Sequence, residues 1–324
     1  MRELTVAIDL YDRHLPLFMG LVPASDGLNI NFLEVGMAPP RRHGINRHRR
    51  MLIEKEFDVA EVSLASYIVA RDQGMDDLIG IPVFPRRLFS HNHIFVSERS
   101  GIKEPRDLVE KKIAVWAFQV TMSVLAKGDL FRDYGIPWRK IFWKTQHVEE
   151  IPIEYGSDIN IELIGEGVDI FDQLQSGEID GYINPHPPEK IMTPGCGIRR
   201  LFNESQDTAK HYIENHGYVP IMHMLVMKKS ILESNPTIGK SLINMFDLAT
   251  KISREFYVDP GFTQIPYTRN ALERQIVELG SDLWPSGISQ NLKNLKDFIG
   301  YCVDQGLISE PIEPESLFHP GTIQ

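Results

Sequence analysis

Two arginines and two histidines lie close together in the stretch IPVFPRRLFSHNHIFV, residues 81–96. An arginine guanidinium pairs with a carboxylate through two parallel hydrogen bonds, so Arg86 and Arg87 near a strand end favour the binding of a dicarboxylate. The alternative interpretation is that the two side chains are solvated and merely flank a turn after Pro85. Their position beside two histidines favours the interpretation that they form a binding site.

The two histidines, His91 and His93, lie two residues apart, so on a strand they share one face. That spacing suits a metal site or a general acid next to a substrate. A metal site needs further ligands, and the sequence holds no HExxH motif and no second His-x-His. We therefore predict that the protein binds no metal.

A carboxylate and several hydroxyls occur in the stretch FDVAEVSLASY, residues 57–67. Glu61 falls inside an apolar strand, where a carboxylate needs a partner such as Arg or His. Ser63, Ser66 and Tyr67 follow at the strand end and in the first helical turn, where hydroxyls either cap backbone amides or hold ligand oxygens. His223, in the apolar stretch PIMHML, is interpreted either as a core histidine or as a functional one.

Gln119 and Thr121 stand at the start of a predicted helix, where free backbone amides favour anions. The stretch RRHGINRHRR, residues 41–50, resembles a nucleic-acid patch. The chain carries a net charge of −10 and offers no further basic stripe. A solvated helix face that steers an anionic ligand is the preferred interpretation.

The composition indicates a globular protein with two domains. The chain has 324 residues, of which 42% are hydrophobic and 24% charged. Its acidic surface is expected to repel nucleic acid and anionic membranes. The N-terminal stretch shows no secretory signal, no apolar run approaches the length of a membrane span, and Cys196 and Cys302 are expected to be reduced thiols. These features predict a cytoplasmic protein with no membrane partner, and they leave homo-oligomerisation open.

Strand and helix patterns alternate along the chain, which favours parallel βα units. The strands are predicted at 4–9, 28–35, 57–64, 78–84, 93–97 and 218–228, with helices at 46–56, 63–74 and 121–134 and mostly helical structure after 231. A chain that leaves one α/β unit, builds a second and returns makes two lobes joined by two crossings. We predict lobe I from 1–93 plus 217–324 and lobe II from 94–216, with a ligand cleft between them.

Several stretches carry a family likeness: YDRH, RML, EFDVAEVSLASYIVAR, IPVFPRRLF, the histidine of SHNHIFV, GIKEPRDLVEKKIAV, YGI and PIMH. Together they resemble the 4,5-dihydroxyphthalate decarboxylase family, which has the two-lobed (type II) α/β architecture of periplasmic solute-binding proteins. The likeness covers residues 1–145 well and continues in patches to the return strand. The positions that match the family pattern are Arg13, Arg50, Glu61, Ser63, Ser66, Tyr67, Arg87, Phe89, His91 and His223. Arg86 and His93 depart from it, which leaves the substrate open.

The resemblance implies a cofactor-independent decarboxylation of a hydroxylated aromatic dicarboxylate, such as 4,5-dihydroxyphthalate to protocatechuate and CO2. Such a reaction needs arginines to hold carboxylates, an acid to protonate the ring and a base for the phenol. Arg13 and Arg87 suit the first role and His91 or His223 the second, while Glu61 or the other histidine suits the third. Two alternatives remain: a solute-binding protein for a small aromatic or anionic ligand, and a biosynthetic enzyme on the same fold.

Overall fold

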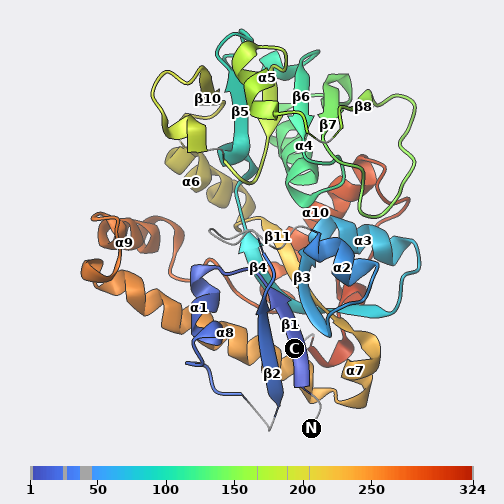
Figure 1. Cartoon of the computed structure of the whole chain (residues 1–324), viewed down its shortest axis with the longest axis vertical. Helices are drawn as coiled ribbons and strands as arrows, with labels where there is room; N and C mark the ends of the chain where they lie inside the picture. Colours follow the sequence, from blue (N-terminus) through green and yellow to red (C-terminus); the bar gives the residue numbers. More distant parts are fainter. Residues whose placement is uncertain are drawn as a thin grey trace. The chain divides into compact units, whose positions relative to one another are not determined.

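The computed structural model describes residues 3–24, 28–36, 46–165, 167–187, 189–203 and 205–322. The chain divides into two compact units (Figure 1). The first unit contains Met1–Arg87, His223–Lys296 and Ile312–Gln324, and the second contains Leu88–Met222 and Asp297–Pro311. The chain changes unit after Arg87 and after Met222, near the two predicted crossings, and twice more around residues 297–311.

The first unit is built on a five-stranded sheet of order β2-β1-β3-β11-β4. The strands are β1 (Glu3–Ile8), β2 (Asn29–Glu34), β3 (Val59–Ser63), β4 (Leu78–Arg87) and β11 (Ile221–Lys228). β1 runs parallel to β2 and β3, whereas β11 is antiparallel to β3 and pairs His223 with Ser63 and Leu225 with Glu61. β4 lies at the edge of the sheet, where Pro82 and Pro85 do not interrupt a central ladder of hydrogen bonds.

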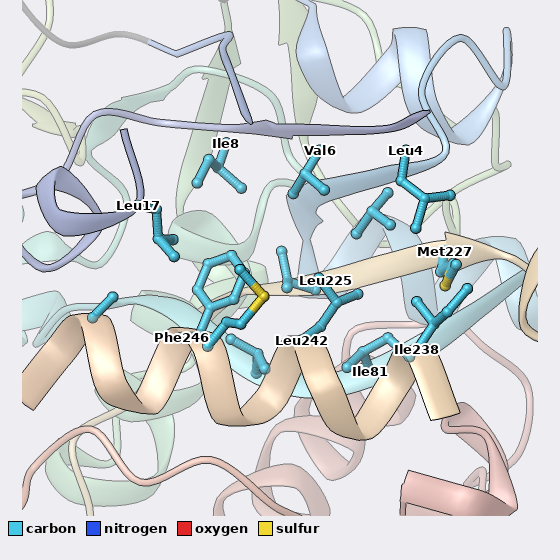
Figure 2. Packing of buried hydrophobic residues seen from close by; sticks show 14 of the residues in the cluster. Leu4, Val6, Ile8, Leu17, Ile81, Leu225, Met227, Ile238, Leu242 and Phe246 are labelled. Carbon is cyan, nitrogen blue, oxygen red and sulfur yellow. The ribbon is translucent and has the colours of Figure 1, made fainter. Parts of the chain in front are cut away.

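The helices of the first unit are α1 (Leu15–Phe18), α2 (Arg47–Leu52), α3 (Leu64–Asp72), α7 (Lys229–Ser234), α8 (Thr237–Val258) and α9 (Thr268–Leu279). Three of them, α2, α3 and α8, contact strands of this sheet, and α1, α7 and α9 contact α8. Figure 2 shows how α8 places Leu242 and Phe246 against side chains of the strands, among them Ile8 and Leu225. Each such side chain contributes roughly 1.5–3 kcal/mol on full burial, so this core fixes the strands that carry the polar residues described below.

The second unit has a six-stranded sheet of order β10-β5-β9-β6-β7-β8. Its strands are β5 (Ile94–Ser97), β6 (Lys112–Val115), β7 (Phe142–Thr145), β8 (Ile161–Leu163), β9 (Gly181–Ile183) and β10 (Ile198–Arg200). Its helices include α4 (Thr121–Tyr134), α5 (Ile170–Ser176) and α6 (Ser205–His216), and α10 (Leu292–Asp304) begins in the first unit and ends in the second.

The prediction of parallel pairing holds for part of each sheet. β6 pairs in parallel with β7 and β9, and β7 with β8, but β5 is antiparallel to β9 and β10. Sequence alternation could not reveal the antiparallel strands β5, β10 and β11, because their partners lie far away along the chain. Within the described part of the chain, no helix is long and apolar enough to cross a membrane.

Candidate active site

The carboxylate of Glu61 is the centre of a buried polar cluster in the first unit. Glu61 lies in the middle of β3 and its side chain is completely buried. The hydroxyl of Tyr11 donates a hydrogen bond of 2.8 Å to Oε1, and the backbone N–H of Asp9 donates one of 3.1 Å to Oε2. Both donors follow β1, the strand that pairs with β3, so the sheet itself brings them to Glu61.

Arg47, in the first turn of α2, compensates the buried charge of Glu61. Its Nη2 lies 3.2 Å from Oε1 of Glu61, and its Nε donates to the backbone carbonyl of the same residue at 2.9 Å. The guanidinium also donates to the carbonyl of Val35 and lies 3.8 Å from the carboxylate of Asp9. This corrects the interpretation of residues 41–50 as a solvated helix face, because Arg47 points into the protein; residues 41–45 lie outside the described residues.

His223 enters the cluster from β11, the neighbour of β3. Its Nδ1 lies 2.5 Å from Oε1 of Glu61, an approach that the register allows because the two residues are diagonal neighbours on paired strands. Burial opposes the charge of Glu61, but the guanidinium of Arg47 and the bond to His223 outweigh it and hold the pKa of Glu61 well below its usual range. Burial also lowers the pKa of His223 to about 4, so the imidazole is neutral near pH 7.

These protonation states fix the tautomer of His223. An ionised carboxylate only accepts hydrogen bonds, so the proton of the neutral ring lies on Nδ1 and the lone pair lies on Nε2. A neutral imidazole oriented in this way by a carboxylate has the geometry to accept a proton at Nε2. The exposed tenth of the side chain shows that the ring is not sealed from solvent.

His48, which the sequence analysis did not select, packs edge-on against His223. The ring centroids are 4.9 Å apart, and Nδ1 of His48 accepts a hydrogen bond of 3.1 Å from the backbone N–H of Ser63. Burial holds the pKa of His48 well below its usual range, so this ring is neutral and carries its proton on Nε2. The two imidazoles therefore have opposite tautomers, one with a proton acceptor at Nε2 and the other with a donor.

The hydroxyl residues around α3 have distinct roles. Ser63 caps the helix, since its Oγ accepts from the backbone N–H of Ser66 at 3.4 Å, as the capping interpretation predicted. The hydroxyl of Tyr67 donates to the carbonyl of Leu317 at 2.7 Å and so ties the C-terminal segment to α3. Ser66 is buried, and its hydroxyl has no hydrogen-bond partner among the described residues.

Arg13 lies beside this cluster. Its Nε donates to the carbonyl of Pro85 at 2.6 Å, and its guanidinium lies 4.2 Å from the centroid of the Tyr11 ring. Arg13 also lines a groove of about 750 Å³ between α8, α9 and the segment 281–290, with its guanidinium 5.0 Å from the ring of Trp284. A cation over an aromatic face at a groove is well placed to meet an aromatic carboxylate.

The other arginines that the sequence analysis selected as candidate site residues are Arg50, Arg86 and Arg87. Nη2 of Arg87 donates to the side chain of Asn291 at 2.6 Å and to the carbonyl of Pro285 at 3.0 Å. Burial lowers the pKa of Arg87 to about 9, which still leaves the guanidinium charged at neutral pH. Arg50 forms an ion pair of 2.6 Å with Glu56, away from Glu61. The positive charge of Arg86 helps to lower the pKa of His223.

His91 and His93 belong to the second unit and do not share a strand face. They lie in a 3-10 helix, Ser90–His93, and β5 begins only at Ile94, so residues two apart point in different directions. The ring of His91 packs 5.3 Å from that of Phe89 and lines a pocket of about 120 Å³, while Nδ1 of His93 lies 3.2 Å from the carbonyl of Asn184. The described residues contain no group of three or more potential metal ligands.

The backbone amides near the start of α4 are not free. The carboxylate of Glu149 accepts 2.9 Å hydrogen bonds from the N–H groups of Phe118 and Gln119, one on each oxygen. The side-chain amide of Gln119 donates to the carbonyl of Ile151, and Thr121 is buried in the first turn of α4. A carboxylate of the chain itself therefore accepts from two backbone amides just before α4, that of Gln119 among them.

Sequence reasoning missed Tyr11, Arg47 and His48 as members of the cluster. One signal was available: a glutamate inside an apolar strand requires a cationic partner. Residues 41–50 offer five arginines, however, and nothing in their spacing shows which of them is buried. Tyr11 follows β1 with no local pattern that distinguishes it.

Comparison with known proteins identifies relatives along the whole chain. The sequence is 28% identical over 330 residues to a 4,5-dihydroxyphthalate decarboxylase from Comamonas testosteroni, covering 99% of this chain and 98% of that protein. It is also 28% identical over 222 residues to a 4,5-dihydroxyphthalate decarboxylase from Pseudomonas putida, covering 67% of this chain and 83% of that protein. These similarities confirm the resemblance inferred from the motifs. No protein-family model matches the sequence.

The solved structures identify the fold. The periplasmic aliphatic sulphonate binding protein SsuA from Escherichia coli superposes with a TM-score of 0.57 at 14% identity, covering 98% of this chain and 92% of that one. The α/β architecture is therefore that of periplasmic binding proteins, as predicted. At this identity the likeness concerns the fold alone, since binding and catalysis occur on the same scaffold.

Proposed function

We propose that this protein catalyses the cofactor-independent decarboxylation of 4,5-dihydroxyphthalate to 3,4-dihydroxybenzoate and CO2. The observation that carries the proposal is the contact of Glu61 with Nδ1 of His223, which leaves Nε2 of a neutral ring free to accept a proton. The similarity to decarboxylases over 99% of the chain supports the choice of reaction. An aromatic dicarboxylate with two phenol groups is the substrate class that the relatives' names suggest.

The chemistry begins with the phenol para to the departing carboxylate. Nε2 of His223 accepts the phenol proton, and the phenolate directs an electron pair to the para carbon, which is then protonated. The carbon–carbon bond to the carboxylate breaks, CO2 leaves, and the bonding electrons restore the aromatic ring. If His91 protonates the ring carbon, His223 returns its proton to the phenolate and solvent reprotonates His91. If His223 passes the phenol proton to the ring carbon, solvent protonates the phenolate. In both cases the net change is the replacement of CO2 by a proton. The phenol itself relays the electrons, so the proposed reaction calls for no organic cofactor.

Glu61 acts in this scheme as a positioning residue. Its side chain is completely buried and already accepts from Tyr11, Asp9, Arg47 and His223, so a phenol of the substrate has no access to its oxygens. Of the two bases that the sequence left open, the geometry therefore favours His223 over Glu61. Stabilising the imidazolium that forms when His223 takes the proton is the second task of the carboxylate.

Arg13 and Arg87 are proposed to hold the substrate carboxylates. Arg13 is supported by its place on the groove and by its contacts with the rings of Tyr11 and Trp284. Arg87 is supported by its buried charge, although its bonds to Asn291 and Pro285 already use one of its terminal nitrogens. The group that protonates the ring carbon is assigned to His91 or to His223, and separate variants of the two decide between them.

The direct test is to incubate the purified protein with 4,5-dihydroxyphthalate and to measure both CO2 and 3,4-dihydroxybenzoate. Isomeric hydroxylated aromatic acids serve as competitors, and His223→Asn is the matched variant because it keeps a polar side chain without a base. Stoichiometric formation of both products by the wild type, reduced by roughly 10²–10⁴-fold in the variant, supports the proposal. Binding of the acid without release of CO2 supports instead a solute-binding protein, the alternative that the likeness to SsuA keeps open.

A further inference from the structure

His48 packs against His223, the proposed base. His48 belongs to α2 and His223 to β11, and the centroids of their rings are 4.9 Å apart at an interplanar angle of 71°. Both residues are part of the first unit, and neither is sealed from solvent: His48 is half-buried, and the side chain of His223 is 10% exposed. The two imidazoles therefore form a polar pair that a bound molecule can reach.

A hydrogen bond at Nδ1 fixes the position of the proton on His48. Nδ1 accepts from the backbone N–H of Ser63 at 3.1 Å, and a nitrogen that accepts carries no proton. A neutral imidazole has one N–H group, so the proton lies on Nε2. In agreement with this, burial holds the pKa of His48 well below its usual range. Nε2 of His48 has no hydrogen-bond partner among the described residues, so its N–H is available to a ligand.

His223 supplies the complementary group. Its Nδ1 contacts Glu61, so Nε2 carries a lone pair, and none of the described residues donates to it. The pair thus offers a ligand one hydrogen-bond donor and one acceptor. The positive charge of Arg86 lowers the pKa of both imidazoles, so this charge acts at the pair and favours a ligand that is, or becomes, negatively charged.

Two adjacent hydroxyls on an aromatic ring fit a donor beside an acceptor. In the proposed reaction His223 accepts the proton of the hydroxyl para to the departing carboxylate, and binding removes the neighbouring hydroxyl from water as well. A hydroxyl taken out of water is destabilising unless it finds a hydrogen-bond partner. The Nε2–H of His48 is such a partner. A hydroxyl that accepts from His48 directs its own proton to the adjacent phenolate oxygen, which helps that oxygen to ionise.

We propose that His48 is a specificity-determining residue that recognises the second hydroxyl of a catechol substrate through its Nε2–H group. The role rests on the proposed function, because it assigns the first hydroxyl to His223. His48 donates a hydrogen bond and transfers no proton, so the balance of the reaction is unchanged. A substrate with a single hydroxyl has no atom for His48 to bind, and selectivity between the two kinds of substrate therefore depends on this side chain.

The test compares 4,5-dihydroxyphthalate with 4-hydroxyphthalate, which keeps one hydroxyl para to a carboxylate and lacks its neighbour. The ratio of the two kcat/KM values measures recognition of the second hydroxyl, and the wild type is expected to prefer the dihydroxy acid by roughly tenfold or more. His48→Asn keeps an acceptor for the N–H of Ser63 but loses the donor, so the ratio should fall roughly tenfold. His48→Gln keeps a donor at the end of the side chain and should retain most of the ratio.

The matched control is His186→Asn, which changes an exposed histidine of the second unit and should keep the wild-type ratio. Equal losses of kcat/KM on the two acids in His48→Asn overturn the proposal, because His48 then supports His223 or contacts the same oxygen. A ratio that falls as far in His48→Gln as in His48→Asn also overturns it, since the shape of the ring then sets the selectivity. A wild type without preference for the dihydroxy acid does the same.

Calorimetry distinguishes a failure of this proposal from a failure of the proposed function. If the protein releases no CO2 from either acid, the proposed function fails, and binding of 3,4-dihydroxybenzoate and 3-hydroxybenzoate takes the place of kcat/KM. These two acids differ by the same hydroxyl and do not react further in the proposed scheme. A preference for 3,4-dihydroxybenzoate that His48→Asn removes supports recognition by His48, whereas equal affinities in the wild type overturn it.

Discussion

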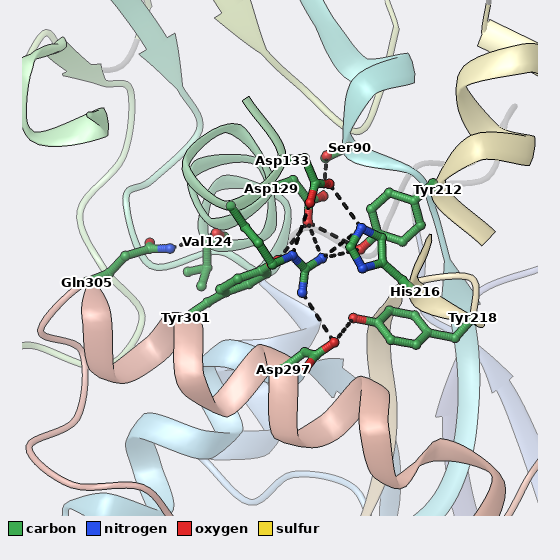
Figure 3. A network of polar contacts seen from close by, with 11 residues as sticks. Ser90, Val124, Asp129, Asp133, Tyr212, His216, Tyr218, Asp297, Tyr301 and Gln305 are labelled. Atoms are coloured by element: carbon green, nitrogen blue, oxygen red, sulfur yellow. Dashed lines mark hydrogen bonds and ion pairs between the residues drawn. The ribbon is translucent and has the colours of Figure 1, made fainter. Parts of the chain in front are cut away.

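We predict that the buried Asp129 in α4 makes the folding stability decrease as pH rises toward neutrality. Its side chain is buried in the second unit and accepts hydrogen bonds from the hydroxyls of Ser90 (2.6 Å), Tyr212 (3.2 Å) and Tyr301 (3.1 Å) (Figure 3). Arg132 lies 3.4 Å away and is its only close cation among the described residues. Burial outweighs these contacts and raises the pKa of Asp129 from 3.8 to about 7.

The sign of the effect follows from the raised pKa. The folded protein keeps the proton on Asp129 up to about pH 7, whereas the unfolded chain loses it above 3.8. Between these two values the folded state binds more protons, so the free energy of unfolding falls as pH rises, and it levels off above pH 7. At about 1.4 kcal/mol per pKa unit the full loss is about 4 kcal/mol, of which about 2.5 kcal/mol falls between pH 5 and pH 8.

The substitution Asp129→Asn removes this titration and keeps the shape of the side chain. Its free energy of unfolding, measured by urea denaturation and compared with the wild type at each pH, is expected to rise by about 2.5 kcal/mol from pH 5 to pH 8 relative to the wild type. Asp207→Asn, which removes an exposed carboxylate from α6, is the matched control. A difference between Asp129→Asn and the wild type that stays constant within about 0.5 kcal/mol across this range refutes the reasoning.

Four further outcomes are expected for the proposed reaction. Glu61→Gln keeps the side-chain shape but removes the charge that orients and stabilises His223, so kcat should fall roughly 100-fold with little change in KM; a rise in KM alone would mean that Glu61 binds the substrate. Arg87→Lys should reduce binding or turnover at least tenfold, about 1.4 kcal/mol, and unchanged kinetics would remove Arg87 from the site. His91→Asn should lower CO2 release more than ligand affinity measured by calorimetry, whereas near-normal turnover makes His91 structural and leaves ring protonation to His223. Activity should survive chelation, and rescue of an inactive chelated protein by one divalent metal would make His91 and His93 ligands.

Most of the fold could be predicted from the sequence, because the patterns that indicate strands and helices are local. The strands β1, β2 and β3 and the helix α4 begin and end within two or three residues of their predicted limits, since hydrophobic periodicity and Gly turns mark them. β4 runs three residues beyond its predicted end at 84, since Pro85 suggested a turn although it lies on an edge strand. Antiparallel pairing of β5 and β11 depends on contacts distant in sequence, which periodicity does not encode.

The candidate site could be predicted from the sequence only in part, because its residues interact with partners that are distant along the chain. A carboxylate inside an apolar strand pointed to Glu61 without any knowledge of its neighbours, and His223 was recognised from its apolar strand. Arg47 and Arg50 lie in the same basic stretch, yet one pairs with Glu61 in the core and the other with Glu56 near the surface. The direction in which α2 docks on β3 decides between them, and a single sequence does not specify it.

The proposed reaction gives a reason for the buried cluster around Glu61 that folding stability does not. A buried ion pair such as that of Arg47 and Glu61 loses in desolvation much of what it gains in attraction, so apolar residues of similar size would serve the fold equally well. A leucine at position 61 would simply continue the apolar pattern of β3, in which Val59, Ala60 and Val62 are completely buried. What an apolar residue cannot do is hold the proton of His223 on Nδ1 and so leave Nε2 free to accept a proton. In the proposed mechanism, the polar groups buried around Glu61 have one functional result: they hold a neutral imidazole in a fixed orientation.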